Sequence, residues 1–182
     1  MASILINIIT FQIGWFACVL GAAQDLPWLG PLVALPIIFL HLYGAAQPAV
    51  ALTLIVAVAI LGSLFDQTLL TLGWIGFPPN FLPETLLPLW MTALWMLFAT
   101  TLNLSLRWLQ GRILLAILFG FIGGPLAYVA GTKLGAMQLL QPEKLLIALA
   151  IGWGTLMPTL LNLAKKLDGF TAKKLQKGIH HV

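Results

Sequence analysis

The chain has 182 residues, of which 60% are hydrophobic and 8% are charged, and its mean hydropathy is +1.02. A water-soluble domain of this length does not cover its surface with so few charges, so the composition excludes that class and indicates a protein that folds in lipid. The formal net charge of +4 does not indicate a nucleic-acid partner, because the basic residues are divided between one loop and the tail, as membrane topology predicts.

Six apolar segments follow one another along the chain. A membrane-spanning helix needs about 20 mainly apolar residues, so a chain of this length with short loops holds about six. We therefore expect an all-α membrane protein with a single transmembrane domain. The predicted spans are residues 3–23, 27–43, 48–72, 85–106, 113–131 and 143–163, followed by a basic tail over residues 164–182.

The first segment resembles a signal peptide, because Gly21-Ala22-Ala23 has the composition of a cleavage site. However, no basic side chain precedes the segment, and Asn7 and Gln12 interrupt its apolar character. We therefore expect the segment to be retained as the first span. Cys18 lies within it and is the only cysteine, so the chain forms no internal disulfide and no multi-cysteine metal site.

The distribution of basic residues predicts the orientation. With six spans and a cytoplasmic amino terminus, seven of the nine basic residues lie on the cytoplasmic side, which matches the positive-inside rule. We therefore expect both termini to be cytoplasmic. The inside residues are Arg107, Arg112, Lys165, Lys166, Lys173, Lys174 and Lys177, and the outside residues are Lys133 and Lys144.

Asp66 interrupts the third apolar segment. At about 1.5 Å per residue it lies roughly 27 Å along a helix that begins at Pro48, inside the hydrocarbon or at its outer edge. An ionised carboxylate there costs about 2.5 to 3.5 kcal/mol unless it has a partner. Lys133, at the outer end of the fifth segment, is the only basic residue at a similar predicted depth apart from Lys144, and Tyr128 lies about one turn deeper. The three residues form either a proton- or cation-coupling site, or an interfacial ion pair of Asp66 with Lys133.

A second polar set is predicted near the inner surface. Amide side chains in lipid seek hydrogen bonds between helices, and each bond contributes about 0.6 to 2 kcal/mol. The set therefore either holds helices together or forms an inward-facing pocket for a lipid headgroup, in which an arginine binds phosphate through its forked donors. It consists of Asn7, His41, Asn103, Arg107 and Asn162.

Small residues recur along the fifth segment. Glycine and alanine at spacings of about four residues form a groove on a helix that lets another backbone approach closely, so we expect this face to pack against a neighbouring helix. A Gly-Gly-Pro break also frees carbonyls that transporters use to hold ions, but no anionic or hydroxyl cluster accompanies it here. The packing residues are Gly120, Gly124, Ala127, Gly131 and Gly135.

The remaining motifs indicate no catalysis. Lys173, Lys174 and Lys177 of the tail are expected to attract anionic lipid, at about 1 kcal/mol each. His180 and His181 make a poor metal site, because two ligands in a terminal tail leave the coordination shell incomplete. The sequence contains no phosphate-binding loop, nucleophile elbow, zinc signature or dinucleotide fingerprint. We therefore predict no cofactor, no metal and no catalytic residue.

Particular strings resemble a known family. Asn7-Ile8-Ile9-Thr10-Phe11-Gln12, Ser105-Leu106-Arg107-Trp108-Leu109 and Gly123-Gly124-Pro125-Leu126-Ala127-Tyr128 are similar to those of small bacterial inner-membrane proteins grouped as the domain of unknown function number 2878. The family pattern has a histidine after the asparagine of the fourth span, whereas Leu104 follows Asn103 here, which argues against a histidine-based mechanism. The resemblance implies no established activity, but it implies an association with enzymes that modify membrane fatty acids.

Three functions remain as alternatives. The first is a non-enzymatic or accessory inner-membrane protein that binds membrane lipid or supports a lipid-modifying complex, with a further protein partner possible in the membrane. The second is a small proton- or cation-coupled transporter centred on Asp66. The third is an intramembrane lipid-acting enzyme, which needs facing acid-base groups such as Asp66 and His41, although the predicted topology places these two near opposite membrane faces. The sequence does not indicate the substrate or the oligomeric state.

Overall fold

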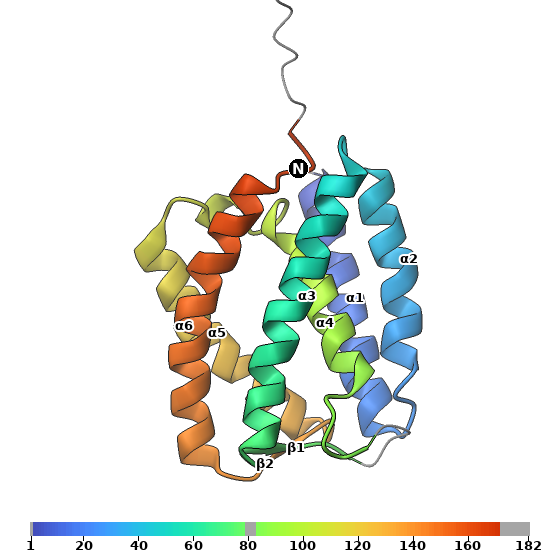
Figure 1. The fold of residues 1–182 in the computed structure, drawn as a ribbon. Helices are drawn as coiled ribbons and strands as arrows, with labels where there is room; N and C mark the ends of the chain where they lie inside the picture. Colours follow the sequence, from blue (N-terminus) through green and yellow to red (C-terminus); the bar gives the residue numbers. More distant parts are fainter. Residues whose placement is uncertain (1, 79–82, 172–182) are drawn as a thin grey trace, which may run out of the picture.

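The computed structural model describes residues 2–78 and 83–171. Over these ranges the chain forms six α-helices, one short 3-10 helix and a two-stranded antiparallel ribbon, and the helices stand side by side as a bundle (Figure 1). The helices are α1 (Ala2–Ala23), α2 (Leu29–Tyr43), α3 (Pro48–Thr71), α4 (Leu89–Leu102), α5 (Ile113–Lys133) and α6 (Pro142–Lys166). The strands are β1 (Ile75–Gly76) and β2 (Gln138–Leu139), and the 3-10 helix is Arg107–Leu109.

Proline and glycine set several helix boundaries. Pro48 and Pro142 are the first residues of α3 and α6, where a proline costs no intrahelical hydrogen bond. Gly73 (φ 67°) and Gly135 (φ 88°) follow α3 and α5 in the left-handed conformation, which commonly ends a helix. Gly135 therefore lies beyond α5 and ends it, so it does not continue the packing face predicted from the spacing of the small residues.

Within the described residues, four helices, α1, α3, α5 and α6, are long and apolar enough to cross a membrane. The shorter α2 and α4 have 15 and 14 residues, or about 22 and 21 Å, whereas the hydrocarbon is about 30 Å thick. The predicted fourth span, residues 85–106, is longer than the observed helix. Pro88 has an extended backbone before α4, and the Thr101 carbonyl accepts the N–H groups of Leu104 and Leu106 in a turn at its end.

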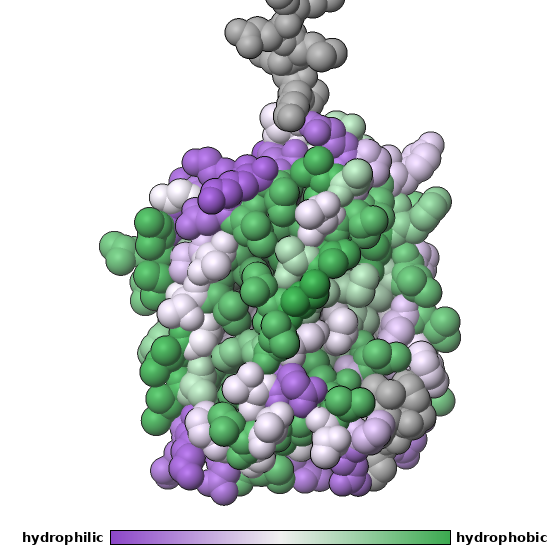
Figure 2. Space-filling model, viewed as in Figure 1, coloured by the Kyte–Doolittle hydropathy of each residue, from purple (hydrophilic) through white to green (hydrophobic). Residues whose placement is uncertain are grey.

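The central helix is α4, which packs against α1, α2 and α3 and also touches α6. Nine of its 14 residues are buried, as expected for a helix that is apolar all round. The exposed apolar side chains instead belong mainly to the surrounding helices. They form a hydrophobic belt between two polar ends of the molecule (Figure 2).

The α5–α6 pair is the most extensive helix contact of the bundle. A Cβ atom at Gly120 would meet the carbonyl of Trp153, and one at Gly124 would meet the Trp153 indole. These two glycines therefore let α6 lie directly against α5, in agreement with their predicted packing role. Of the other predicted packing residues, Gly131 is buried beside Met137, whereas Ala127 is exposed.

The amino-terminal end of α1 and the carboxyl-terminal end of α6 lie at the same end of the bundle (Figure 1), which we call the terminal end. The basic residues that were predicted to lie inside are at this end wherever the structure describes them. Arg107 and Arg112 lie between α4 and α5, and Lys165 and Lys166 lie in the last turn of α6. Lys133 and Lys144 lie at the opposite end. The tail residues Lys173, Lys174, Lys177, His180 and His181 are outside the described residues.

Gly124 allows a test of the α5–α6 contact. We expect Gly124→Leu to lower the free energy of unfolding by about 1–3 kcal/mol, because a leucine there competes with Trp153 for the same space. Unfolding can be followed with a thiol-reactive dye, since Cys18 is fully buried in the folded chain. Gly123→Leu is the matched control, because a Cβ atom there would meet only Phe119, at 4.0 Å. Equal losses of stability in the two variants would contradict the assigned contact.

Candidate functional site

A cavity of about 340 Å³ lies between α1 and α4 on one side and α5 and α6 on the other. Its volume is in the range of pockets that bind small molecules. The α5 wall consists of Gly120, Gly123, Gly124, Ala127, Gly131 and larger residues beside them. The aromatic lining residues are Phe11, Trp15, Trp90, Trp95, Phe98, Phe119, Tyr128 and Trp153.

The cavity opens through the flank of the bundle. Its exposed lining residues are Gln12 of α1 and Phe119 and Ala127 of α5. These residues lie within their helices and away from the helix ends, at the height of the apolar belt. A molecule dissolved in the hydrocarbon of a bilayer therefore has direct access to the cavity.

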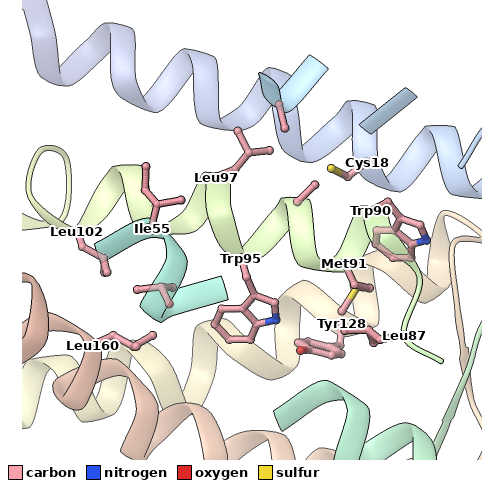
Figure 3. Close-up of a cluster of buried hydrophobic side chains, with 14 of the residues drawn as sticks. Cys18, Ile55, Leu87, Trp90, Met91, Trp95, Leu97, Leu102, Tyr128 and Leu160 are labelled. Carbon is pink, nitrogen blue, oxygen red and sulfur yellow. The ribbon is translucent and has the colours of Figure 1, made fainter. Parts of the chain in front are cut away.

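Asp66 is buried behind the cavity wall, with 0% of its surface exposed. The Tyr128 hydroxyl donates a hydrogen bond to its Oδ1, and the Trp95 indole N–H donates one to its Oδ2 at 2.7 Å. The two donors come from α5 and α4, so one carboxyl group on α3 connects three helices. Trp95 and Tyr128 lie side by side in the interior (Figure 3), and both line the cavity.

The register of the α3–α4 hairpin brings Trp95 to Asp66. The hydroxyls of Ser63 and Thr92 share a hydrogen bond of 3.0 Å between the two helices. Gly62, one turn before Asp66, leaves room for the Trp95 ring, which occupies the space that a Cβ atom would need. The indole therefore lies flat against α3, and its N–H reaches the carboxyl group.

The sequence analysis did not identify Trp95 or Gly62 as site residues. The available signal was the four-residue spacing of Gly62 and Asp66, which places both on one face of α3. That spacing does not indicate which aromatic residue covers the face, because the answer depends on the register of α4.

Trp95 also stacks on Trp153 of α6, with ring centroids 4.7 Å apart and planes 13° from parallel. Phe98 packs edge-on against both indoles, at 6.0 and 5.3 Å. Such offset and edge-to-face arrangements are favoured beyond the area that they bury. The aromatic group therefore fixes one wall of the cavity and links α4 to α6.

Asp66 accepts a hydrogen bond from Tyr128, which the sequence placed near it in the predicted coupling site, and forms no ion pair with Lys133, its predicted ion-pair partner. Lys133 is the last residue of α5 and forms no ion pair with any acid in the part of the chain that the structure describes. The interpretation of Asp66 as a hydrated interfacial acid neutralised by Lys133 does not fit its complete burial. A role of Asp66 and Tyr128 in ion coupling stays a prediction.

Part of the inner polar set gathers at the terminal end. The Asn7 side chain donates to the Thr100 carbonyl and accepts hydrogen bonds from the backbone N–H and the hydroxyl of Ser105. The Asn103 side chain donates to the Leu167 carbonyl, and the Asn103 backbone carbonyl accepts a hydrogen bond of 2.8 Å from Arg107 Nε. These contacts join α1 to the end of α4, and the end of α4 to the segment after α6.

Residues 167–171 fold back over the terminal end of the bundle. Asp168 forms an ion pair of 2.8 Å with Arg107, and the Gly169 carbonyl accepts the N–H of Gln47 at 2.9 Å. Partial burial by itself raises the pKa of the Asp168 carboxyl, but the hydrogen bonds from Thr171, Arg107 and the Phe170 N–H, together with the Arg107 charge, lower it below its usual value. Arg107 is thus engaged within the protein, and a phosphate-binding role for it stays a prediction.

Among the described residues, the other two members of the inner polar set take no part in these hydrogen bonds. The His41 ring packs against Phe170 with centroids 4.8 Å apart, and Asn162 is exposed on α6. His41 lies at the terminal end, whereas Asp66 is 18 residues along α3 from Pro48, about 27 Å at the helical rise. Asp66 and His41 therefore do not share an acid-base site. Over residues 2–78 and 83–171, no group of three His, Cys, Asp or Glu side chains is placed to hold a metal ion.

Tyr128 tests the buried carboxyl interaction. We expect Tyr128→Phe to lower the free energy of unfolding by about 1–3 kcal/mol, because a buried Asp66 oxygen loses its donor while the aromatic volume is kept. Dye labelling of Cys18 measures the effect. Tyr43→Phe is the matched control, since the sequence has two tyrosines and Tyr43 is 83% exposed. If Tyr128→Phe were as stable as Tyr43→Phe, the hydrogen bond would not stabilise the bundle.

Comparison with known proteins identifies a family but no activity. Residues 4–159 match the family described as "Protein of unknown function (DUF2878)". The comparisons with curated proteins and with solved structures gave no match. The matched residues include the cavity, Asp66 and both of its hydrogen-bond donors. Because the match covers most of the chain, this protein belongs to the DUF2878 family.

Proposed function

We propose that this protein binds the acyl chain of a membrane lipid in the cavity between α1, α4, α5 and α6. The observation that carries the proposal is the apolar cavity that opens through the flank of the bundle at the height of the apolar belt. A cavity open to the aqueous ends would admit polar solutes. One that opens into the hydrocarbon admits molecules that are already dissolved there.

The shape and chemistry of the lining support this proposal. The aromatic walls and the small residues of α5 leave a mainly apolar space, and the open side between Gln12 and Ala127 lets the rest of a bound lipid remain in the bilayer. Pockets for apolar ligands combine such walls with a few polar groups that fix orientation. The protein would therefore bind lipid as a carrier, a sensor or an accessory subunit of membrane-lipid modification.

The membrane topology is part of the same proposal. All six helices cross the inner membrane of a bacterium, with α2 and α4 completed by their flanking loops and both termini in the cytoplasm. The support for this orientation is the concentration of basic residues at the terminal end. In this orientation the inner polar set lies near the headgroups, and the predicted attraction of the basic tail to anionic lipid concerns the cytoplasmic leaflet.

Filling the cavity from α5 is the direct test. Gly123 lines the cavity and has free space where a Cβ atom would be, so Gly123→Leu should occupy the cavity without disturbing the contact with α6. The protein is placed in nanodiscs that contain a phospholipid with a photoactivatable diazirine in one acyl chain. We expect wild type to be cross-linked at buried cavity residues such as Met157, and Gly123→Leu to lose most of these adducts.

Leu126→Trp is the control for this experiment, because Leu126 is 61% exposed on the same helix and does not line the cavity. This variant adds volume on the lipid-facing side and should keep the cavity adducts. Adducts distributed evenly over the exposed apolar belt in wild type, or adducts in the cavity that persist in Gly123→Leu, would refute acyl-chain binding at this site.

The complete burial of Asp66 favours a second candidate function, a small proton- or cation-coupled transporter. Ionisable groups within membrane helices commonly lie on ion pathways, and Asp66 is the one fully buried acid among the described residues. Its two donors belong to different helices, so a change in its protonation would alter the contact of α3 with both α4 and α5. The acid also lies directly behind two residues of the cavity wall.

Proton flux distinguishes this candidate. In proteoliposomes with an internal pH-sensitive dye and an imposed potential, a transporter centred on Asp66 predicts that Asp66→Asn reduces flux at least tenfold, because the variant has no titratable group at this position. Asp25→Asn is the control, since Asp25 lies in a loop with positive φ that asparagine also adopts. Flux in Asp66→Asn equal to that of wild type, or no flux above that of empty liposomes in wild type, excludes the transporter.

A further inference from the structure

Gln12 places an amide group in the middle of the first long helix. It is the eleventh of the 22 residues of α1, so it lies about 15 Å from either end of the helix. Its side chain is exposed on the flank of the bundle, and within residues 2–78 and 83–171 the amide has no hydrogen-bond partner. In a bilayer that α1 spans, a group that both donates and accepts hydrogen bonds therefore faces hydrocarbon.

Two other polar side chains of the long helices show how the fold satisfies such groups. On α3, Gln67 donates to the Thr85 carbonyl at 2.8 Å and accepts the Leu87 N–H at 2.9 Å. On α1, the Thr10 hydroxyl donates to the Ile6 carbonyl of its own helix at 2.9 Å. An unpaired polar group in hydrocarbon is unfavourable, so the exposed amide of α1 needs a partner from outside the chain.

The residues around Gln12 form an apolar face on α1. Helix positions three, four and seven apart lie on one side, so Leu5, Ile9 and Phe16 flank Gln12, and all three are exposed. The opposite side of α1 packs against α2 and α4. The exposed face is thus an apolar stripe with one amide at its centre, as in helix pairs whose register is fixed by a single polar residue.

Lipid and water do not supply the missing partner at this depth. The ester groups of phospholipids lie at the edge of the hydrocarbon, about 15 Å from the middle of the bilayer, and the core contains no water. A second copy of the chain does supply it. Two copies inserted in the same orientation hold Gln12 at equal depth, and an amide can donate to and accept from another amide. A different protein would need its own polar group at that depth.

We propose that two copies of this chain pair through α1 about a two-fold axis, with their Gln12 amides hydrogen-bonded to each other. A two-fold interface uses the same patch on both copies, so a residue on the axis meets its own counterpart. Gln12 also lines the open side of the cavity, so the second copy borders the cavity at α1, while Phe119 and Ala127 on α5 stay in contact with lipid. The inference requires α1 to span the membrane and does not require acyl-chain binding.

Energy transfer between labelled copies measures the association. Chains that carry a donor or an acceptor fluorophore on an appended carboxyl-terminal tag are reconstituted together in phospholipid vesicles, and the amount of lipid is increased stepwise. We expect Gln12→Leu to raise the dissociation constant about 3- to 30-fold, as the loss of interhelical amide hydrogen bonds implies. Thr155→Val is the matched control and should leave the constant unchanged, because Thr155 is exposed on α6 and bonds only within its own helix.

Gln12→Asn separates amide pairing from a general effect of substitution at this position. This variant keeps a shorter amide at the same depth, so it should associate to within about threefold of wild type. Labelling of Cys18 establishes that each variant is folded, since Cys18 is fully buried in the folded chain.

Disulfide cross-linking locates the interface. Ile9→Cys puts a thiol on the proposed face, and Ile122→Cys puts one near the middle of α5, at a position of similar exposure (50% and 54%). Under oxidation by copper phenanthroline, we expect Ile9→Cys to form covalent dimers and Ile122→Cys to form few, because a disulfide requires Cα atoms within about 7 Å of each other. The buried Cys18 does not compete.

The outcomes decide between a second copy and another occupant of the α1 face. A wild type that stays monomeric at every lipid ratio would overturn the proposal and assign the amide to a different partner. The proposal also fails if Gln12→Leu and Thr155→Val share one dissociation constant, or if Ile122→Cys cross-links as efficiently as Ile9→Cys. If Gln12→Leu did not fold, the two cysteine variants would decide the question.

Discussion

A carboxyl group in the interior of an apolar bundle needs hydrogen-bond donors, and this requirement organises the middle of the molecule. Asp66 accepts one hydrogen bond from α4 and one from α5. These side-chain hydrogen bonds join three helices in the middle of the bundle. The same two donors, Trp95 and Tyr128, form part of the cavity wall. The position of the wall therefore depends on an interaction that lies behind it.

Glycines complete this arrangement by giving the indoles a place to lie. Gly62 accepts the ring of Trp95, Gly124 accepts the side chain of Trp153, and Gly120 accepts the Trp153 backbone, so both indoles pack closely against neighbouring helices and stack on each other. Where α5 presents Gly123 and Ala127, no partner fills the space. The cavity thus results from small residues on one helix facing an aromatic group whose members are already held by other contacts.

The structure separates two polar regions that have different consequences. At the terminal end, Asn7, Asn103 and Arg107 bond to backbone groups and to Asp168, which closes the end of the bundle with residues 167–171. In the middle, the group around Asp66 joins α3, α4 and α5 and forms part of the cavity wall. The first region closes one end of the bundle, whereas the second sets the position of the cavity wall.

Composition and periodic apolar segments were sufficient to predict six helices, their order, most of their ends and the unequal distribution of basic residues, because lipid requires long apolar helices and the charges report topology. The need of Asp66 for a partner and the packing role of Gly120 and Gly124 were also accessible, since each residue type has few acceptable surroundings in hydrocarbon, but the sequence left a coupling site with Tyr128 and an interfacial ion pair with Lys133 as alternatives. The sequence did not determine the short length of α4, the role of Trp95 or the cavity. These features depend on the register and closeness of helices that are distant in sequence, and only the packed bundle decides which side chains meet and where none do.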